Sequence, residues 1–328
     1  MAGLDRCTAR PARLSRTRRS RRGIALVLVL WVLTLLTVMA VGMTAAQRTE
    51  TALTENQIAD ARFRALTDAA IAYTLFDLIN PPPAAPEVGL GADETAVPVW
   101  LPNGAPRSWE FDGTALSIAL FNEQSRINLN LAPAPILAAL LVALGVEDEA
   151  AGAIGDAIVD WRDEDDLKQL NGAEDSDYED DGRVAGAKDA PFVAVEELQQ
   201  VLGVTRELYR LAAPELTVDA EGDEVEQTFA SAAVLAALQG IALDEAQLQV
   251  QERDQPTLPG GQLPSAVNRG GPLYRIQVRE QGGQAAGARG MEAVVEVAPG
   301  QVPPYQVRWR RFGLITAPPT PLPVEEGG

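Results

Sequence analysis

A block of arginines meets a long apolar run near the N-terminus. Residues 18–22 carry four arginines, Gly23 follows, and no ionisable side chain occurs in residues 24–47. As a helix this run would be about 36 Å long, whereas the hydrocarbon core of a bilayer is about 30 Å thick. The segment can therefore cross a membrane, with the arginines on the cytoplasmic side and the rest of the chain beyond the bilayer.

Two kinds of targeting segment fit this pattern. A cleaved secretory signal has an apolar core of about 7–15 residues and a small-x-small cleavage site, and the present run is longer. An uncleaved signal anchor keeps both its basic leader and its apolar helix. The residue pattern by itself leaves both interpretations open.

The apolar run continues into an amphipathic stretch. Residues 48–79 contain no Pro or Gly, and their apolar side chains recur at spacings of three and four. Pro81 and the two prolines after it would end the helix. We expect one helix from Ile24 to Asn80, about 85 Å long. The alternative is two helices with a break near Gly42.

The composition excludes several classes of function. The 328-residue chain has a formal net charge of −19, and residues 1–23 hold eight of the 27 basic and one of the 46 acidic residues, so the remainder has a net charge of −26. A body this acidic repels phosphate backbones, which argues against nucleic-acid binding. The single cysteine, Cys7, lies in the leader, so no disulfide framework is expected. The absence of histidine excludes Ser-His and Cys-His catalysis.

Alternating apolar residues predict an antiparallel sheet. Residues 108–111 and 114–120 flank Asp112-Gly113, a dipeptide favoured in type I′ hairpin turns. Three further strands are expected near the C-terminus: residues 273–278, 291–297 and 305–312.

Pro-rich segments interrupt this pattern. Residues 97–101 include Pro98 and are expected to form at most a short edge strand, because proline cannot donate to a ladder. Residues 317–328 are also Pro-rich and are expected to be disordered.

Residues 133–216 have the pattern of several short helices. Their Leu-Gly-Val turns suggest helix-hairpin-helix units, which often bind DNA, but the acidic composition argues against that role. The helices expected from the apolar spacing and the cap residues are 135–144, 148–163, one from 195, 206–211, and a later one at 225–239.

Two acidic runs lie between these helices, at residues 160–166 and 174–181. Ca²⁺ is a hard cation that takes 6–8 oxygen ligands, and Asp163 with Asp165 could converge on one ion while Glu174 and Asp177 close the shell. The EF-hand spacing is absent, so a solvated acidic loop is an equally open interpretation. Paired carboxylates could also serve acid–base catalysis, but no nucleophile accompanies them.

The N-terminus resembles the class III signal of type IV pilins and type II secretion pseudopilins. In these families a prepilin peptidase cuts after the glycine of the leader, which would place the cut between Gly23 and Ile24. Most members carry Glu at the fifth mature position, where this chain has Leu28.

The order of later motifs resembles the K-class minor pseudopilins of type II secretion systems, whose members also lack that Glu. The similar segments are Arg-Ile-Asn-Leu-Asn at 126–130, Ile-x-Asp-Trp-x-Asp at 158–163, Gly-Ala-Glu-Asp with a following Tyr at 172–178, and the helical continuation at 195–204. The resemblance extends from the leader to about residue 218, and more loosely to Trp309.

The resemblance implies an α+β fold, in which a pilin-like long N-terminal helix packs on an antiparallel sheet that is interrupted by a large inserted helical domain. The implied domains are a basic leader (1–23), the transmembrane part of the helix (24–47), the first part of the pseudopilin core (48–132), the inserted calcium-binding helical domain (133–216), the second part of the core (217–316) and the tail (317–328). One or two Ca²⁺ ions are expected in the insertion, with five candidate ligands: Asp160, Asp163, Asp165, Glu174 and Asp177.

The function implied by the resemblance is that of a non-enzymatic minor pseudopilin, anchored by a single pass in the inner membrane with its body in the periplasm. It would lie at the pseudopilus tip and nucleate assembly with I-class and J-class minor pseudopilins. It would act with the inner-membrane secretion platform in export across the outer membrane. The alternatives are a minor pilin of a type IV pilus, a signal-anchored calcium-binding periplasmic protein and a metal-dependent hydrolase.

Overall fold

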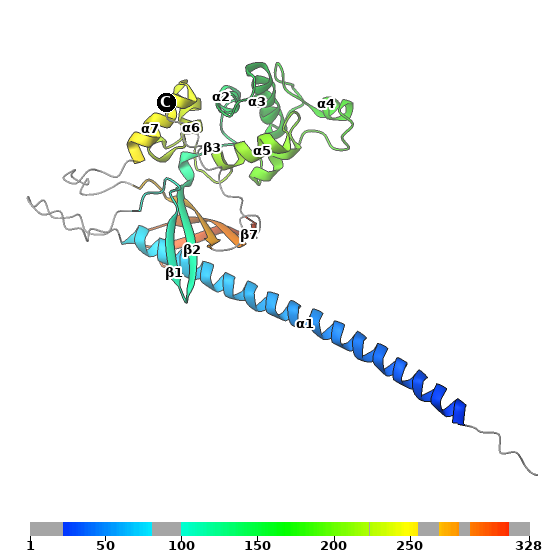
Figure 1. Cartoon of the computed structure of the whole chain (residues 1–328). Coiled ribbons are helices and arrows are strands. Elements are labelled where there is room, and N and C mark those ends of the chain that lie inside the picture. The colour runs from blue at the N-terminus through cyan, green and yellow to red at the C-terminus, as the bar shows by residue number, and fades with distance from the viewer. Residues whose placement is uncertain (1–21, 81–99, 223, 255–268, 282–288, 315–328) are drawn as a thin grey trace, which may run out of the picture. The chain divides into compact units, whose positions relative to one another are not determined.

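The computed structural model describes residues 22–80, 100–222, 224–254, 269–281 and 289–314 (Figure 1). The chain forms two compact units, residues 1–63 and 64–328. The predicted tail at 317–328, most of the leader at 1–23 and residues 97–99 of the predicted edge strand lie outside the described residues. Trp100 and Leu101, the remainder of that predicted strand, are not in a strand.

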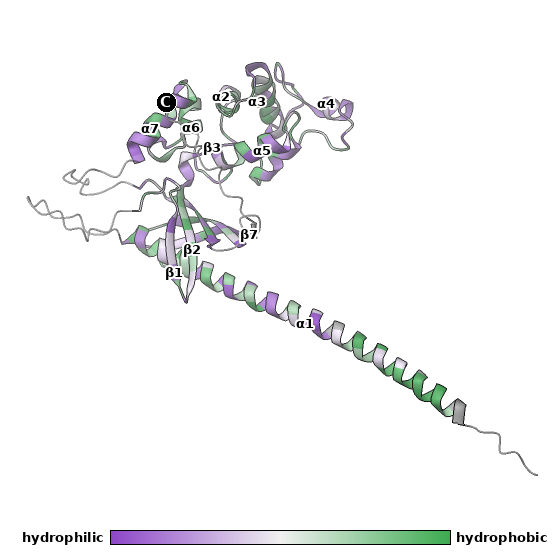
Figure 2. Cartoon of the chain, in the orientation of Figure 1, coloured by the Kyte–Doolittle hydropathy of each residue, from purple (hydrophilic) through white to green (hydrophobic). Residues whose placement is uncertain are grey.

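Helix α1 runs without interruption from Arg22 to Ile79. The prediction of a single helix is confirmed, and the alternative of a break near Gly42 is wrong. Its N-terminal part is apolar (Figure 2), and the most apolar 18-residue window has a mean hydropathy of 2.6 with none of it buried. Within the described ranges, α1 is the one helix long and apolar enough to cross a membrane.

A five-stranded antiparallel sheet follows, in the order β1-β2-β5-β6-β7. Its strands are β1 (Arg107–Phe111), β2 (Thr114–Asn122), β5 (Leu273–Glu280), β6 (Arg289–Val297) and β7 (Tyr305–Leu314). Asp112 and Gly113 both have positive φ, 49° and 68°, as a type I′ turn requires. The predicted hairpin and the three predicted C-terminal strands are therefore confirmed.

One face of this sheet packs against the C-terminal part of α1. Tyr73 stacks on Trp109 of β1 with 5.2 Å between ring centroids, and Asp68 forms an ion pair with Arg310 of β7. Helix α1 therefore crosses the sheet from one edge strand to the other. The buried strand residues that alternate along this sheet are Leu116, Ile118, Leu120, Ile276, Val278, Met291, Ala293 and Val295.

The chain between β2 and β5 forms a helical domain (Figure 1). Its α-helices are α2 (Ala134–Ala143), α3 (Asp148–Arg162), α4 (Asp175–Asp180), α5 (Arg206–Ala212), α6 (Ala232–Gln239) and α7 (Leu243–Asp254). Short 3-10 helices are η1 (Glu123–Ser125), η2 (Val195–Gln200), η3 (Ala213–Glu215) and η4 (Gln227–Phe229). The parallel strands β3 (Ile127–Asn128) and β4 (Leu216–Thr217) pair where the domain begins and where α5 has ended.

Local features explain where this domain differs from the expected helices. The helix expected at 225–239 begins only at Ala232, because the hydroxyl of Ser231 accepts from the Val234 N–H at 3.2 Å and caps it there. The helix expected from residue 195 is the 3-10 helix η2. Helices α4 and α7 were not expected, since their sequences are mostly polar.

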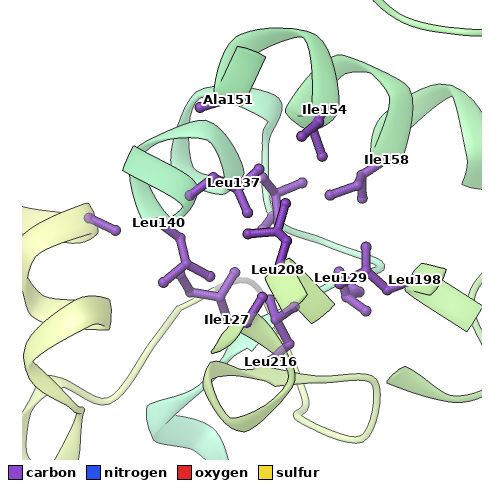
Figure 3. Packing of buried hydrophobic residues seen from close by; sticks show 14 of the residues in the cluster. Ile127, Leu129, Leu137, Leu140, Ala151, Ile154, Ile158, Leu198, Leu208 and Leu216 are labelled. Atoms are coloured by element: carbon purple, nitrogen blue, oxygen red, sulfur yellow. The ribbon is translucent and has the colours of Figure 1, made fainter. Parts of the chain in front are cut away.

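The helical domain has a single connected hydrophobic cluster among the described residues, from Ile127 to Ala246 (Figure 3). Leu137, Leu140 and Leu141 of α2 meet Ile154 and Ile158 of α3 in this cluster. Helices α6 and α7 also contribute to it. The packing of the helical domain therefore extends beyond the predicted boundary at residue 216.

A buried charged cluster joins the helical domain to the sheet. Glu123, which is fully buried, accepts hydrogen bonds from Thr217 Oγ1 at 2.5 Å and from Arg275 Nε at 2.8 Å. Arg126 Nε lies 3.6 Å from the same carboxylate. On the same side, Trp309 Nε1 of β7 donates to Asp219 at 2.7 Å. Residues at the start of the helical domain and around β4 are thus both held on the sheet by hydrogen bonds and ion pairs.

Two glycines of α3 provide a matched test of the α2–α3 packing. A Cβ at Gly155 would lie 2.9 Å from the Ala134 carbonyl oxygen, whereas a Cβ at Gly152 would meet nothing within 4 Å. We expect Gly155→Ala to destabilise the protein by about 1–3 kcal/mol through overpacking. Gly152→Ala should stabilise it by about 0.5–1 kcal/mol through helix propensity. Thermal melting of both variants checks this, and equal shifts would contradict the close approach.

Candidate metal centre

The acidic loop begins at the end of α3, where Asp160 is fully buried. Its carboxylate accepts the backbone N–H of Gln169 at 3.1 Å and of Ala173 at 2.8 Å. A Cβ at Gly172 would lie 1.8 Å from Asp160 Oδ2, so only glycine fits at this position. Asp160 therefore closes the loop by accepting hydrogen bonds from its backbone. This explains the glycine of the Gly-Ala-Glu segment, because a side chain at Gly172 would collide with Asp160.

Two carboxylate oxygens in this region are buried without a hydrogen-bond partner: Asp163 Oδ1 and Glu174 Oε1. Asp163 is the residue at the C-terminal end of α3, and Glu174, only 7% exposed, directly precedes α4. A buried anionic oxygen without a partner costs free energy. These two oxygens are therefore the ones in the loop that are best suited to a hard cation.

Repulsion among the carboxylates appears in their pKa values. Burial, followed by the negative charges of Asp160, Asp163 and Asp189, raises the pKa of Glu174 to about 7. Burial and the charge of Asp165 raise the pKa of Asp163. Negative charge is thus concentrated around Asp163 and Glu174, and a bound cation would relieve it.

Two of the predicted ligands have other partners. Asp177 Oδ1 forms an ion pair with Lys168 Nζ at 2.6 Å, and its Oδ2 accepts the Glu174 N–H at 3.0 Å. Asp165 is exposed, and its Oδ1 accepts the Leu167 N–H at 2.9 Å. In the part of the chain that the structure describes, no three acidic side chains are arranged to hold one ion. The five predicted ligands therefore do not converge as a set.

Asp189 is a residue that the sequence reasoning missed. It lies outside both acidic runs, yet its charge acts on Asp163 and on Glu174. Its φ of 53° places it in the left-handed region, which Asp tolerates better than most residues. A lone Asp in a turn carries no spacing signal, so the sequence could not mark it as part of the site.

Aromatic packing and an arginine hold the loop in place. Trp161 packs against Tyr178 of α4 with 5.7 Å between ring centroids, and against Phe192 with 6.3 Å. The Tyr178 hydroxyl accepts the Leu202 N–H at 3.2 Å. Arg162 donates to the carbonyl of Ala132 at 2.7 Å. The end of α3 and the helix α4 are therefore fixed on either side of Asp163 and Glu174.

Comparison with known proteins gives matches to a protein family and to solved structures. Residues 116–220 match the family described as type II secretion system (T2SS), protein K. A chain of the crystal structure of the GspK-GspI-GspJ complex from the enterotoxigenic Escherichia coli type 2 secretion system is similar in fold, with a TM-score of 0.50 and 17% identity over 80% of this chain and 99% of that chain. No curated protein sequence matches the chain.

These matches agree with the architecture. The predicted α+β fold, with a long N-terminal helix, an antiparallel sheet and an inserted helical domain, is confirmed. The family match spans β2, where the sheet leads into the helical domain, as well as the acidic loop. The chain is therefore similar to type II secretion system protein K over residues 116–220, and it shares the fold of a chain from the GspK-GspI-GspJ complex.

Proposed function

We propose that this chain is a K-class minor pseudopilin of the type II secretion system. A prepilin peptidase would cut it between Gly23 and Ile24, and the apolar part of α1 would then hold it in the inner membrane. The observation that carries this proposal is the unbroken helix from Arg22 to Ile79, which has an apolar N-terminal part and, among its described side chains, buried residues only from Phe63 onward. The body would lie in the periplasm, since the arginines before the helix favour the cytoplasmic side.

The protein would act as a structural subunit and not as an enzyme. It would occupy the tip of the pseudopilus and nucleate assembly with I-class and J-class minor pseudopilins, on the inner-membrane secretion platform. The similarity to a chain from a GspK-GspI-GspJ complex supports this choice of partners. Leu28 supports the tip position, because an unpaired Glu inside a bilayer would be costly in a subunit with no neighbour above it.

Calcium binding in the helical domain is part of the proposal. Asp163 and Glu174 would hold the ion, since each has a buried oxygen without a partner, and Asp189 is the further carboxylate whose charge acts on both. The ion would supply positive charge that neutralises this loop. Asp160 would position the loop through its backbone hydrogen bonds, while Asp165 and Asp177 would stay with their present partners.

The processing step can be tested by sequencing the N-terminus of the full chain after co-expression with a prepilin peptidase. We expect the mature protein to begin at Ile24 and to stay in the membrane fraction. Gly23→Val should block the cut, whereas Gly42→Val, at a glycine of the same helix with open space around it, should not. A start at Met1 or beyond Ala46 in the wild-type chain would overturn the filament role.

A further inference from the structure

The outer edge of β1 is an open strand edge. β1 is the terminal strand of the sheet, and only β2 pairs with it in the described ranges. In a two-residue hairpin the residues flanking the turn are hydrogen-bonded to each other, and successive pairs alternate. The backbone groups of Ser108 and Glu110 therefore face away from β2. Ala115 lies opposite Glu110, and its backbone likewise does not bond across the hairpin. Its carbonyl instead accepts the Gln281 N–H at 2.9 Å, on the side of β2 away from β1.

A row of aromatic rings runs along this edge. Tyr73 of α1 stacks on Trp109 with 5.2 Å between centroids, and Trp109 stacks on Phe111 with 5.1 Å. Phe111 is 48% exposed, and Phe76, one helical turn beyond Tyr73, is 67% exposed. Exposed aromatic residues that lie together on an otherwise acidic body are typical of a protein interface.

A depression of about 380 Å³ adjoins the start of the same strand. Trp100, Arg107 and Ser108 are among its lining residues. Trp100 is only 3% exposed, and its Nε1–H, which is buried, has no acceptor. Because Nε1 is itself buried, a partner in the depression would contact other atoms of its lining residues.

We propose that an extended strand of a second minor pseudopilin pairs with the outer edge of β1. Its backbone would hydrogen-bond to Ser108 and Glu110, and its alternate apolar side chains would cover Trp109 and Phe111. Main-chain pairing of this kind supplies affinity, while the alternate side chains supply specificity. The choice of a minor pseudopilin as the partner rests on the proposed function. The open edge and the row of aromatic rings are features of the structure and do not depend on it.

The other edge and the chain's own Pro-rich segment fit this role less well. Charged side chains protect a strand edge from pairing, and β7 carries three arginines that form ion pairs within the chain: Arg308 with Glu296, Arg310 with Asp68, and Arg311 with Glu196. Residues 81–99, which precede Trp100, contain five prolines and two glycines, and both residue types are depleted in strands.

The interaction can be mapped by photocrosslinking, because the chain has a single cysteine, Cys7. In a Cys7→Ser background, Ser108→Cys and, as a control on β7, Gln306→Cys are labelled with a thiol-reactive benzophenone. Each full chain is mixed with purified I-class and J-class minor pseudopilins and irradiated. We expect position 108 to crosslink to a partner strand and position 306 to give at least tenfold less product.

Two substitutions separate strand pairing from side-chain contact. Phe111→Ala should weaken partner binding about tenfold or more, whereas Phe312→Ala, at a phenylalanine of similar exposure in β7, should leave it unchanged. Glu110→Pro, combined with Ser108→Cys, removes an N–H that faces away from β2, so it should abolish crosslinking from position 108 while the melting temperature stays close to that of the wild type.

The outcomes distinguish this inference from the proposed function. Crosslinks from position 108 to residues 81–99 of the same chain, or equal crosslinking at position 306, would overturn the strand-pairing proposal while leaving a chain that starts at Ile24 as a pseudopilin. If the chain is not processed at Gly23 and position 108 still crosslinks to another protein, the function is wrong and the edge is a docking site for a different class of partner.

Discussion

Glu123→Gln is expected to destabilise the protein by about 3–5 kcal/mol, because it removes the fully buried carboxylate that pairs with two buried arginines. Arg275 contacts Glu123 through Nε at 2.8 Å, and its side chain is 8% exposed. Arg126 is 7% exposed and lies 3.6 Å from the same carboxylate. Urea unfolding of the wild type and the variant, with the m-value of each, would measure the loss in the free energy of unfolding.

The charge state of this cluster has a consequence for acid stability. Burial opposes the charged form of Glu123, but the guanidinium groups of Arg275 and Arg126 outweigh burial and hold its pKa below the ordinary value of 4.5. Burial and the charge of Arg275 lower the pKa of Arg126 to about 10. The unfolded chain therefore binds a proton at Glu123 before the folded protein does. The stabilisation is present above pH 4.5 and is lost as the pH falls below it.

A surface ion pair provides the control for Glu123. Glu296 Oε2 lies 2.7 Å from Arg308 Nη2, with both side chains partly exposed, and such pairs contribute about 0–1 kcal/mol. Glu296→Gln should therefore have little effect. If Glu123→Gln were as mild as Glu296→Gln, the cluster would not hold the helical domain on the sheet. A double-mutant cycle with Arg275→Met would then separate the pairwise energy from the cost of the charge left unpaired.

Features that depend on neighbouring residues could be predicted from the sequence, whereas contacts between residues far apart in the chain could not. The hairpin was predictable because Asp112-Gly113 specifies its own turn. The continuity of α1 was predictable because apolar spacing, absence of Pro and Gly in residues 48–79, and a final proline run agree. The Glu123 cluster was not, since Thr217 and Arg275 lie 94 and 152 residues away. No periodicity connects residues at that separation.

The acidic loop illustrates the same limit within a short segment. The sequence identified the loop and included Asp163 and Glu174, whose buried oxygens lack partners. It gave Asp165 and Asp177 equal weight because composition does not show which carboxylates already have partners. Lys168 and the backbone N–H of Leu167 satisfy them in the structure. Asp189 was missed because a turn, and not a spacing rule, brings its charge toward the site.

Removal of calcium is expected to lower the stability of the helical domain by about 4 kcal/mol when the free ion exceeds its Kd about 1,000-fold. The ion would neutralise Asp163 and Glu174, which in its absence carry buried oxygens without partners. Thermal melting with calcium and with a chelator measures the difference. A chelator-treated protein that melts at the same temperature as the calcium-loaded protein would exclude calcium as a structural ligand.

Variants of the loop should separate ligands from bystanders. Glu174→Gln and Asp163→Asn should each remove most of the calcium-dependent shift in melting temperature, and without calcium they should melt at or above the wild type, because each removes a crowded buried charge. Asp177→Asn and Asp165→Asn should keep the calcium-dependent shift, since those side chains have other partners. If Asp177→Asn lost the calcium-dependent shift and Asp165→Asn kept it, Asp177 would exchange Lys168 for the ion. The ligand set would then include Asp177, as expected from the sequence.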